Sequence, residues 1–210
     1  MAYYKPNGYM QYETIRDCYE QLNTDSLENL VGNMWNNILR EYFFNREGFQ
    51  LEVQPRSAPG KTKNSNDVTI CYIKNGTQKH LVLIEHERVT LKGSDTIWKD
   101  AFEQVTEYML LTHSKSTEMV EDMFGIVSVG RYSRFYILKS DQITLIDHPV
   151  TGGALLEFKK DEMEVVDLLL SIKVQALRTS PAAPQGPAQA RPGSRDGTTA
   201  SHPGSREASH

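Results

Sequence analysis

Two carboxylates stand near the end of an apolar segment, residues 81 to 89, which reads LVLIEHERV. Side chains of a β-strand alternate between its two faces, so Glu85 and Glu87 are predicted to share one face. A second strand-like segment begins at Asp67 and precedes this one. Facing residues of a hairpin have numbers of constant sum, and a sum of 152 places Asp67 opposite Glu85. Three carboxylates would then converge beside a hydrophobic sheet.

The convergence depends on the length of the hairpin loop. Asn75-Gly76 is typical of a two-residue turn, but that turn gives a sum of 151 and sends Glu85 to the face opposite Asp67. A loop of odd length, Asn75 to Thr77 or Lys74 to Gln78, restores the sum of 152. We therefore predict an odd-length loop.

Clustered carboxylates repel one another and lose solvation when buried, so a cation is expected to share their site. Mg²⁺ and Mn²⁺ prefer oxygen ligands, and Mg²⁺ uses few carboxylates while keeping several waters. Such an ion can activate water and stabilise charge on a phosphate under attack. The pattern predicts a site for Mg²⁺ or Mn²⁺ at Asp67, Glu85 and Glu87, with phosphodiester hydrolysis as the reaction. The alternatives are a turn-forming acid at Asp67, a solvent-facing or salt-bridged Glu87, and a regulatory protein whose acidic cluster only stabilises structure.

The elements that would position these residues follow from periodicity. Apolar residues at helical spacing predict a long helix over 25–45, with a weaker helix over 12–22 before it. Alternating and β-branched segments predict strands, and a polar loop is expected over 55–66. The fold class is predicted to be α/β, an α/β/α sandwich with a mixed central sheet. The further predicted elements are strands at 49–53, 67–74, 81–88, 124–129, 134–138 and 143–146, and helices at 94–113 and from 161 onward.

Composition sets the domain limits. The last residue of the apolar pattern is Leu177, and residues 178–210 hold five of the nine prolines and four glycines without any Val, Ile, Leu, Met or aromatic residue. That composition is typical of a disordered segment. We predict an N-terminal extension over 1–24, a single domain over 25–177 and a disordered tail over 178–210.

The net charge restricts the partners. The chain carries 23 basic and 27 acidic residues, a net charge of −4. The tail has four arginines and two acidic residues, so residues 1–177 carry −6. A generally basic nucleic-acid coat is excluded, and nucleic acid would be held locally, through the loop residues Arg56, Lys61 and Lys63 or through bound cations.

Two cysteines and the lack of an apolar run near 18 residues predict an intracellular protein, in cytoplasm or nucleus, that does not span a membrane.

Taken in order, these residues resemble the PD-(D/E)XK nuclease superfamily, with its restriction-endonuclease-like and RecB-like branches. The matching positions are Asn66-Asp67, then LVLIEHER with Glu85-His86-Glu87, then FEQVTEYM with Gln104 and Tyr108. The segment FGIVSVGRYSRFYIL, residues 124–138, is similar to the hairpin that follows the helix in that family. The resemblance spans roughly residues 25 to 140.

The resemblance implies a core of order αβββαβ, here with extra strands and a C-terminal helix. It also implies a magnesium-dependent nuclease acting on DNA rather than RNA, with Asp67, Glu85, Glu87, Gln104 and Tyr108 in the catalytic site. Glu87 departs from the pattern, because the family has a lysine there that orients the attacking water. Some restriction endonucleases with Glu at this position use it in metal coordination. The alternative is a catalytically inactive member that binds nucleic acid or protein, and a homodimer is left open.

The remaining candidates are weaker. His80, His86 and His113 lack the spacing of metal ligands, and surface positions are expected for them and for His148. Trp98 and Tyr132 are expected to pack in the core or at its rim, with stacking on nucleobases as the alternative.

Overall fold

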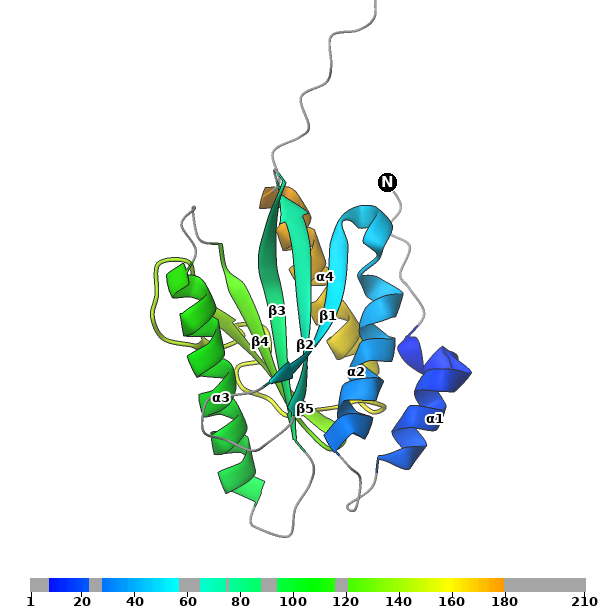
Figure 1. Ribbon diagram of the computed structural model, residues 1–210. Coiled ribbons are helices and arrows are strands. Elements are labelled where there is room, and N and C mark those ends of the chain that lie inside the picture. The colour runs from blue at the N-terminus through cyan, green and yellow to red at the C-terminus, as the bar shows by residue number, and fades with distance from the viewer. Residues whose placement is uncertain are drawn as a thin grey trace, which may run out of the picture. The chain divides into compact units, whose positions relative to one another are not determined.

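The computed structural model describes residues 8–22, 28–56, 65–74, 76–87, 94–115 and 121–179. Its helices and its first five strands follow the predicted order (Figure 1). The strand predicted over 143–146 is wrong, since only Ile146–Asp147 is a strand in that described part of the chain, and the short strand Leu156–Glu157 was not predicted. The helices are α1 (Glu13–Gln21), α2 (Glu28–Tyr42), α3 (Ser94–Lys115) and α4 (Glu162–Thr179). The strands are β1 (Phe49–Arg56), β2 (Ser65–Lys74), β3 (Thr77–Glu87), β4 (Met123–Val129), β5 (Tyr132–Leu138), β6 (Ile146–Asp147) and β7 (Leu156–Glu157). Short 3₁₀ turns cover Tyr9–Gln11 and Asn45–Glu47.

The seven strands of the described chain form one mixed sheet. Its order is β1-β2-β3-β4-β5-β6, and β7 also pairs with β5. Only β3 and β4 pair in parallel, and α3 makes the crossover between them. Every other pairing is antiparallel. The α/β class and the mixed sheet are thus confirmed.

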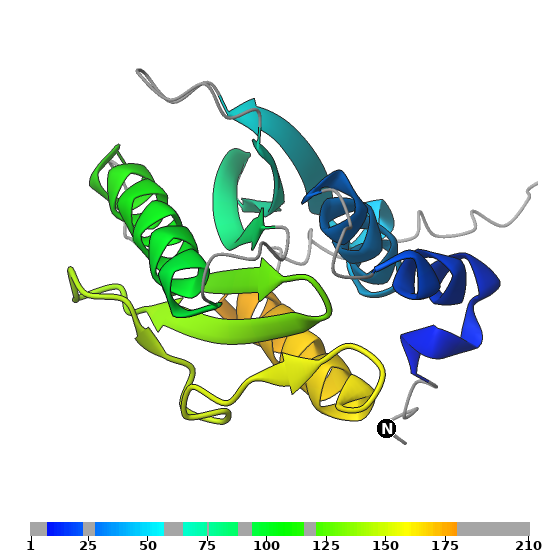
Figure 2. The same ribbon diagram turned by 90° about the horizontal axis from the view of Figure 1, so that it is seen from below.

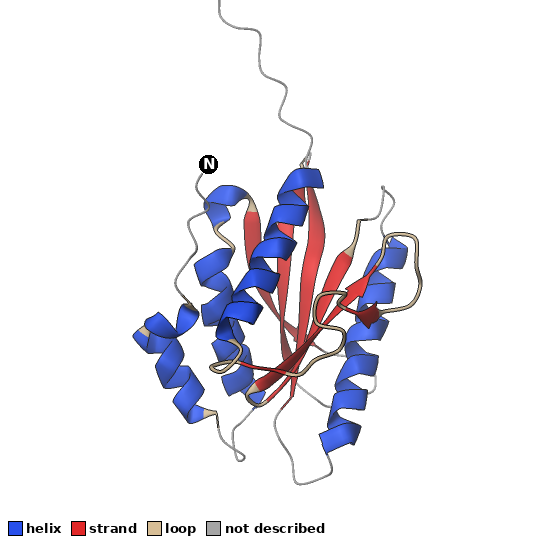
Figure 3. Cartoon of the chain, turned by 180° about the vertical axis from the view of Figure 1, so that it is seen from behind, coloured by secondary structure: helices blue, strands red, loops and turns tan. Residues whose placement is uncertain are grey.

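Helices cover both faces of the sheet, as Figure 2 shows along the sheet and Figure 3 from behind. Strand alternation divides the core in two: Leu83 and Val127 pack with α3, whereas their neighbours Ile84 and Ile126 pack with α2 and α4. The larger cluster, on the α2–α4 side, is centred on the fully buried Trp35. We call the opposite side the α3 face.

The N-terminal segment belongs to the domain wherever it is described. Tyr9, Ile15, Tyr19 and Leu22 are buried in the larger cluster, and the Tyr9 hydroxyl donates a hydrogen bond to the Phe158 carbonyl. The boundary predicted after residue 24 therefore does not separate an extension from the fold. The physical reason is that the apolar stripe of α1 needs a partner, and α2 supplies it.

Two further predicted boundaries are wrong. Helix α4 continues through Arg178 to Thr179, where a basic residue in the last turn suits the helix dipole. Strands β1 and β2 run further than predicted, so Arg56 is paired with Ser65 rather than lying in a loop. Residues 180–210 lie outside the described residues. No described helix is long and apolar enough to cross a bilayer.

Candidate functional site

The β2–β3 hairpin sets the position of the two carboxylates through a bulge. At the turn, Lys74 pairs with Thr77, which gives a sum of 151 and a two-residue Asn75-Gly76 loop. The register shifts between Ile70 and Cys71, where β3 carries one extra residue, and from there the sum is 152. The predicted odd-length loop is wrong. The predicted sum of 152 near the acidic residues is confirmed, because the bulge reverses the parity that the loop had set.

The extra residue of the bulge is Leu81. Ile70 pairs with Val82, and Cys71 pairs with His80, so Leu81 has no opposite residue. Leu81 and Val82 are consecutive, yet both are buried in the larger core cluster. The bulge therefore lets two successive apolar residues pack in the same core cluster. It also reverses the alternation of the residues that follow, which sets the face on which each of them lies.

Glu85 and Glu87 lie on the α3 face and are both buried. Glu85 is 0% exposed and Glu87 is 6% exposed. They alternate with Ile84, which faces α2 and α4, and follow Leu83, which packs with α3. β3 ends at Glu87, whose carbonyl accepts a hydrogen bond of 3.2 Å from the Gly130 amide in the β4–β5 turn. Two carboxylates are thus held on one face at the edge of the hydrophobic layer.

Asp67 lies within β2, where its backbone pairs with Gln54 of β1. The β2–β3 ladder reaches the pair Val68 and Ile84, and the same register continued by one residue would set the backbone of Asp67 opposite Glu85. The side chain of Asp67 lies outside the described residues, as do the side chain of Arg56 and all of Lys61 and Lys63. Among the side chains that are described, no group of three or more His, Cys, Asp or Glu residues is arranged to hold a metal ion.

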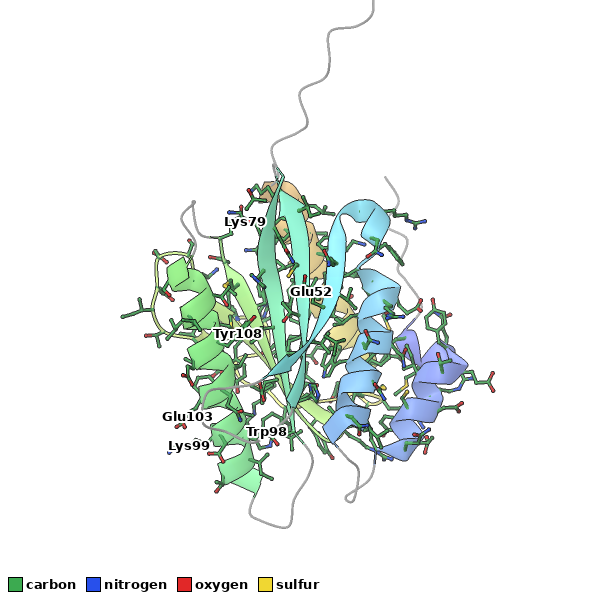
Figure 4. The ribbon with its side chains drawn as sticks, viewed as in Figure 1. Glu52, Lys79, Trp98, Lys99, Glu103 and Tyr108 are labelled. Atoms are coloured by element: carbon green, nitrogen blue, oxygen red, sulfur yellow. The ribbon has the colours of Figure 1, made fainter. Side chains whose placement is uncertain are left out.

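Helix α3 brings one of the two predicted supporting residues to the carboxylates. Gln104 Nε2 donates to Glu87 Oε1 at 3.5 Å, a long hydrogen bond. Tyr108, one turn later, is partly buried and packs against the core cluster on the α3 face (Figure 4). Gln104 thus contacts Glu87, and Tyr108 packs beside it on the same helix.

His86 corrects the expectation of a surface role. It is 0% exposed and points to the opposite side of the sheet from its two neighbours, against Gly32 of α2. A cavity of about 50 Å³ there is lined by His86 and by Asn29, Asn33 and Asn36 of α2. Neither ring nitrogen has a hydrogen-bond partner within the described part of the protein. Burial lowers the pKa of His86 to about 4, so the imidazole is neutral at pH 7.

The other histidines differ among themselves. His148 is also buried, and burial lowers its pKa. His80 is half-buried, with its Nδ1 atom 3.4 Å from the sulfur of Cys71. That pair is not an activated nucleophile, because burial raises the pKa of the Cys71 thiol to about 11 and keeps it protonated.

A larger pocket on the same face was missed by sequence reasoning. It has a volume of about 420 Å³ and lies between α3 and β5, with Asp147 of β6 at its margin. We call it the α3–β5 pocket; it is lined by Asp95, Trp98, Lys99, Phe102, Arg134, Tyr136 and Asp147. Its seven lining residues are spread over the 53 positions from Asp95 to Asp147, so no local motif marks it.

Strand pairing relates the backbone of the acidic pair to that of the pocket. Glu85 of β3 pairs with Val127 of β4, and Val127 pairs with Arg134 of β5. Residues paired across adjacent strands share a face, so Glu85 and Arg134 stand on the α3 face two strand spacings apart, about 10 Å.

No family model, curated protein or solved structure matches this chain.

Proposed function

We propose that this chain is a metal-dependent nuclease-like enzyme that hydrolyses phosphodiester bonds in DNA or RNA. The observation that carries the proposal is the burial of Glu85 and Glu87 on one face, at 0% and 6% exposure. Buried carboxylates on one face of a strand are costly unless hydrogen bonds or a cation offset their charge. The register of Val68 with Ile84, continued by one residue, would bring Asp67 opposite Glu85, and this supports Asp67 as a third ligand.

The donor set suits the proposed ion. Mg²⁺ is commonly held by one or two carboxylates with water and substrate phosphate completing its coordination. Glu85 and Glu87 would hold Mg²⁺ or Mn²⁺, with Asp67 as the further ligand. When bound, the ion supplies charge stabilisation at the phosphate and activates water for in-line attack.

The protein's own groups would orient the reaction. Gln104 donates to Glu87 and so limits the rotation of that carboxylate. Burial of the pair lowers the local dielectric constant, which strengthens the interaction of each carboxylate with a cation. In this arrangement Glu87 serves as a ligand or a general base, in the position where the similar family has a lysine.

One observation favours a second candidate, a catalytically inactive module that binds nucleic acid or protein. Glu87 replaces the motif lysine with a side chain of opposite charge. An enzyme of this design must therefore activate water without that lysine, whereas a binding module has no such requirement.

The proposed partner is nucleic acid, DNA rather than RNA. Arg56, Lys61 and Lys63 would contact its phosphate backbone. Both cysteines, Cys18 and Cys71, are free thiols, which supports an intracellular location.

A metal-dependent cleavage assay tests the proposal. Plasmid, single-stranded DNA and RNA are incubated with Mg²⁺ or Mn²⁺, with EDTA as the blank, and binding of each metal is measured by calorimetry. We expect metal-dependent cleavage that Glu85→Gln lowers by about 100-fold or more. The matched control is Glu107→Gln, which removes the same charge from an exposed position of α3 and should leave the rate unchanged. Binding of nucleic acid without metal uptake or cleavage would favour the inactive module.

A further inference from the structure

Aromatic and charged side chains combine in the α3–β5 pocket in a way that suits a ligand with a flat ring and an anionic group. The ring of Trp98 lies under the Arg134 guanidinium, with Cζ 5.0 Å from the ring centroid. Phe102 and Tyr136 pack against each other at 5.0 Å between centroids and form an aromatic wall. The volume of about 420 Å³ falls within the usual range for small-molecule sites.

Polar groups of both signs line the pocket. Arg134 and Lys99 are cationic, and Asp95 and Asp147 are anionic, so the lining has no net charge. Within the described part of the chain, Arg134 Nε is buried and has no hydrogen-bond partner. A buried donor without a partner is unusual and calls for an acceptor, which a ligand in the pocket would supply. Lys99 lies on the outer side of α3, where it forms an ion pair with Glu103 at 3.8 Å, and Trp98 lies on the sheet side (Figure 4).

A nucleotide matches this lining better than a polyanion does. Its base offers a π-face to Trp98 and amino groups that can donate to Asp95 or Asp147. Its phosphate accepts hydrogen bonds from Arg134. The backbone of a duplex would gain from a run of cations without acidic residues, which this lining does not provide. The bases of a duplex are stacked on both faces, so only an unpaired or extruded base can enter a pocket.

The position of the pocket connects it to the carboxylates. Arg134 and Glu85 lie about 10 Å apart on one face. At a rise of about 3.4 Å per nucleotide or more, a strand covers this distance within about three nucleotides. A base held in the pocket would therefore place a nearby phosphodiester at the acidic pair.

We propose that the α3–β5 pocket binds one nucleotide of an unpaired nucleic-acid strand, with the base against Trp98 and the phosphate at Arg134. This inference rests on the proposed function, since it names the form of nucleic acid that would reach Glu85 and Glu87. It predicts a preference for single strands over duplexes.

Tryptophan fluorescence tests the proposal without catalysis. Single-stranded DNA and RNA dodecamers and the DNA duplex of the same sequence are titrated in EDTA, so cleavage cannot interfere. The chain has two tryptophans, and Trp35 is fully buried, so quenching reports on Trp98. We expect a single strand to quench the fluorescence of Trp98. The duplex should bind with an affinity at least about tenfold lower. Inorganic polyphosphate should compete poorly, because it has no base.

Variants test the same site by fluorescence anisotropy with a labelled strand. Arg134→Gln and Trp98→Leu should each weaken binding about tenfold, the scale of one lost stacking or phosphate contact. Arg40→Gln, which removes a positive charge from an exposed position of α2 across the sheet, should bind as the wild type does. Circular dichroism verifies that each variant folds. If Trp98→Leu fails to fold, the affinity of Arg134→Gln and the fluorescence quenching of the wild type test the proposal.

The proposal would be overturned if the single strand does not bind or binds without quenching Trp98. Wild-type affinity in the folded variants would also overturn it. So would binding of the duplex and of polyphosphate as tight as that of the single strand. These outcomes differ from failure of the proposed function. Absence of metal-dependent cleavage would leave nucleotide binding in EDTA intact, and cleavage with unaltered binding by Arg134→Gln would refute the pocket alone.

Discussion

Acidification should destabilise the folded chain through His86, which lies on the α2–α4 side of the sheet. Burial lowers the pKa of this imidazole from 6.5 to about 4 in the folded state. Below pH 6.5 the unfolded chain therefore takes up a proton at His86 that the folded chain does not accept until about pH 4. The free energy of unfolding is thus unaffected by His86 above this window and falls as the pH is lowered through it.

The size of the effect follows from the two pKa values. At about 1.36 kcal/mol per pKa unit, the difference between 6.5 and about 4 corresponds to about 3 kcal/mol. That loss would be complete near pH 4, where the folded state also begins to accept the proton. It is a large part of the stability of an ordinary domain, about 5–15 kcal/mol.

Urea unfolding of the wild type and of His86→Gln, followed by circular dichroism, measures this effect. Gln keeps a polar side chain at the site but does not titrate, and the other five histidines are common to both proteins. Between about pH 7.5 and about pH 4.5, the wild type should lose about 2–3 kcal/mol more than the variant does. EDTA is present throughout, so metal uptake at the neighbouring carboxylates plays no part. Parallel pH profiles for the two proteins would refute the argument that the buried imidazole stays neutral.

Two further substitutions test the packing. A methyl group added at Gly32 would lie 2.7 Å from His86 Nε2, so Gly32→Ala should lower the free energy of unfolding by about 1–3 kcal/mol. In a His86→Ala background the same change should leave the free energy of unfolding unchanged or raise it by up to about 1 kcal/mol, because Ala favours a helix more than Gly does. An equal decrease in both backgrounds would contradict the contact between position 32 and His86. Tyr9→Phe removes the hydrogen bond to the buried Phe158 carbonyl and should cost about 1 kcal/mol or more in denaturant unfolding. Tyr132→Phe, at an exposed position, should stay within about 0.5 kcal/mol of the wild type, and equal effects of the two tyrosine changes would argue against the Tyr9 bond.

Sequence periodicity was sufficient for the elements and much of their order. The apolar stripe of α2 and the alternating strands β1 to β3 are local patterns, and the sequence predicts each of these elements, although the three strands run two to four residues further than predicted at one end. The alternation that pairs Glu85 with Glu87 on one face is also local, because it depends only on the two-residue period of a strand. Boundaries were less certain, since the docking of α1 and the last turn of α4 depend on contacts with distant residues.

The register of the hairpin shows where local reasoning reached its limit. The Asn75-Gly76 turn and the sum of 152 are incompatible in a regular hairpin, and both occur here because β3 contains a bulge at Leu81. Nothing in the sequence of the two strands identifies that residue. The position of the bulge is decided by the larger core cluster, in which both Leu81 and Val82 are buried.

The amino-acid sequence alone determined the α/β class, the acidic pair on one strand face and the helix that supplies Gln104. Only the tertiary structure decided that His86 is buried, that a bulge sets the parity of the hairpin, and that Trp98 and Arg134 meet in one pocket. The reason is the range of the forces involved. Strand and helix periods follow from backbone geometry a few residues at a time, whereas burial and pockets come from packing between segments that are far apart in the chain.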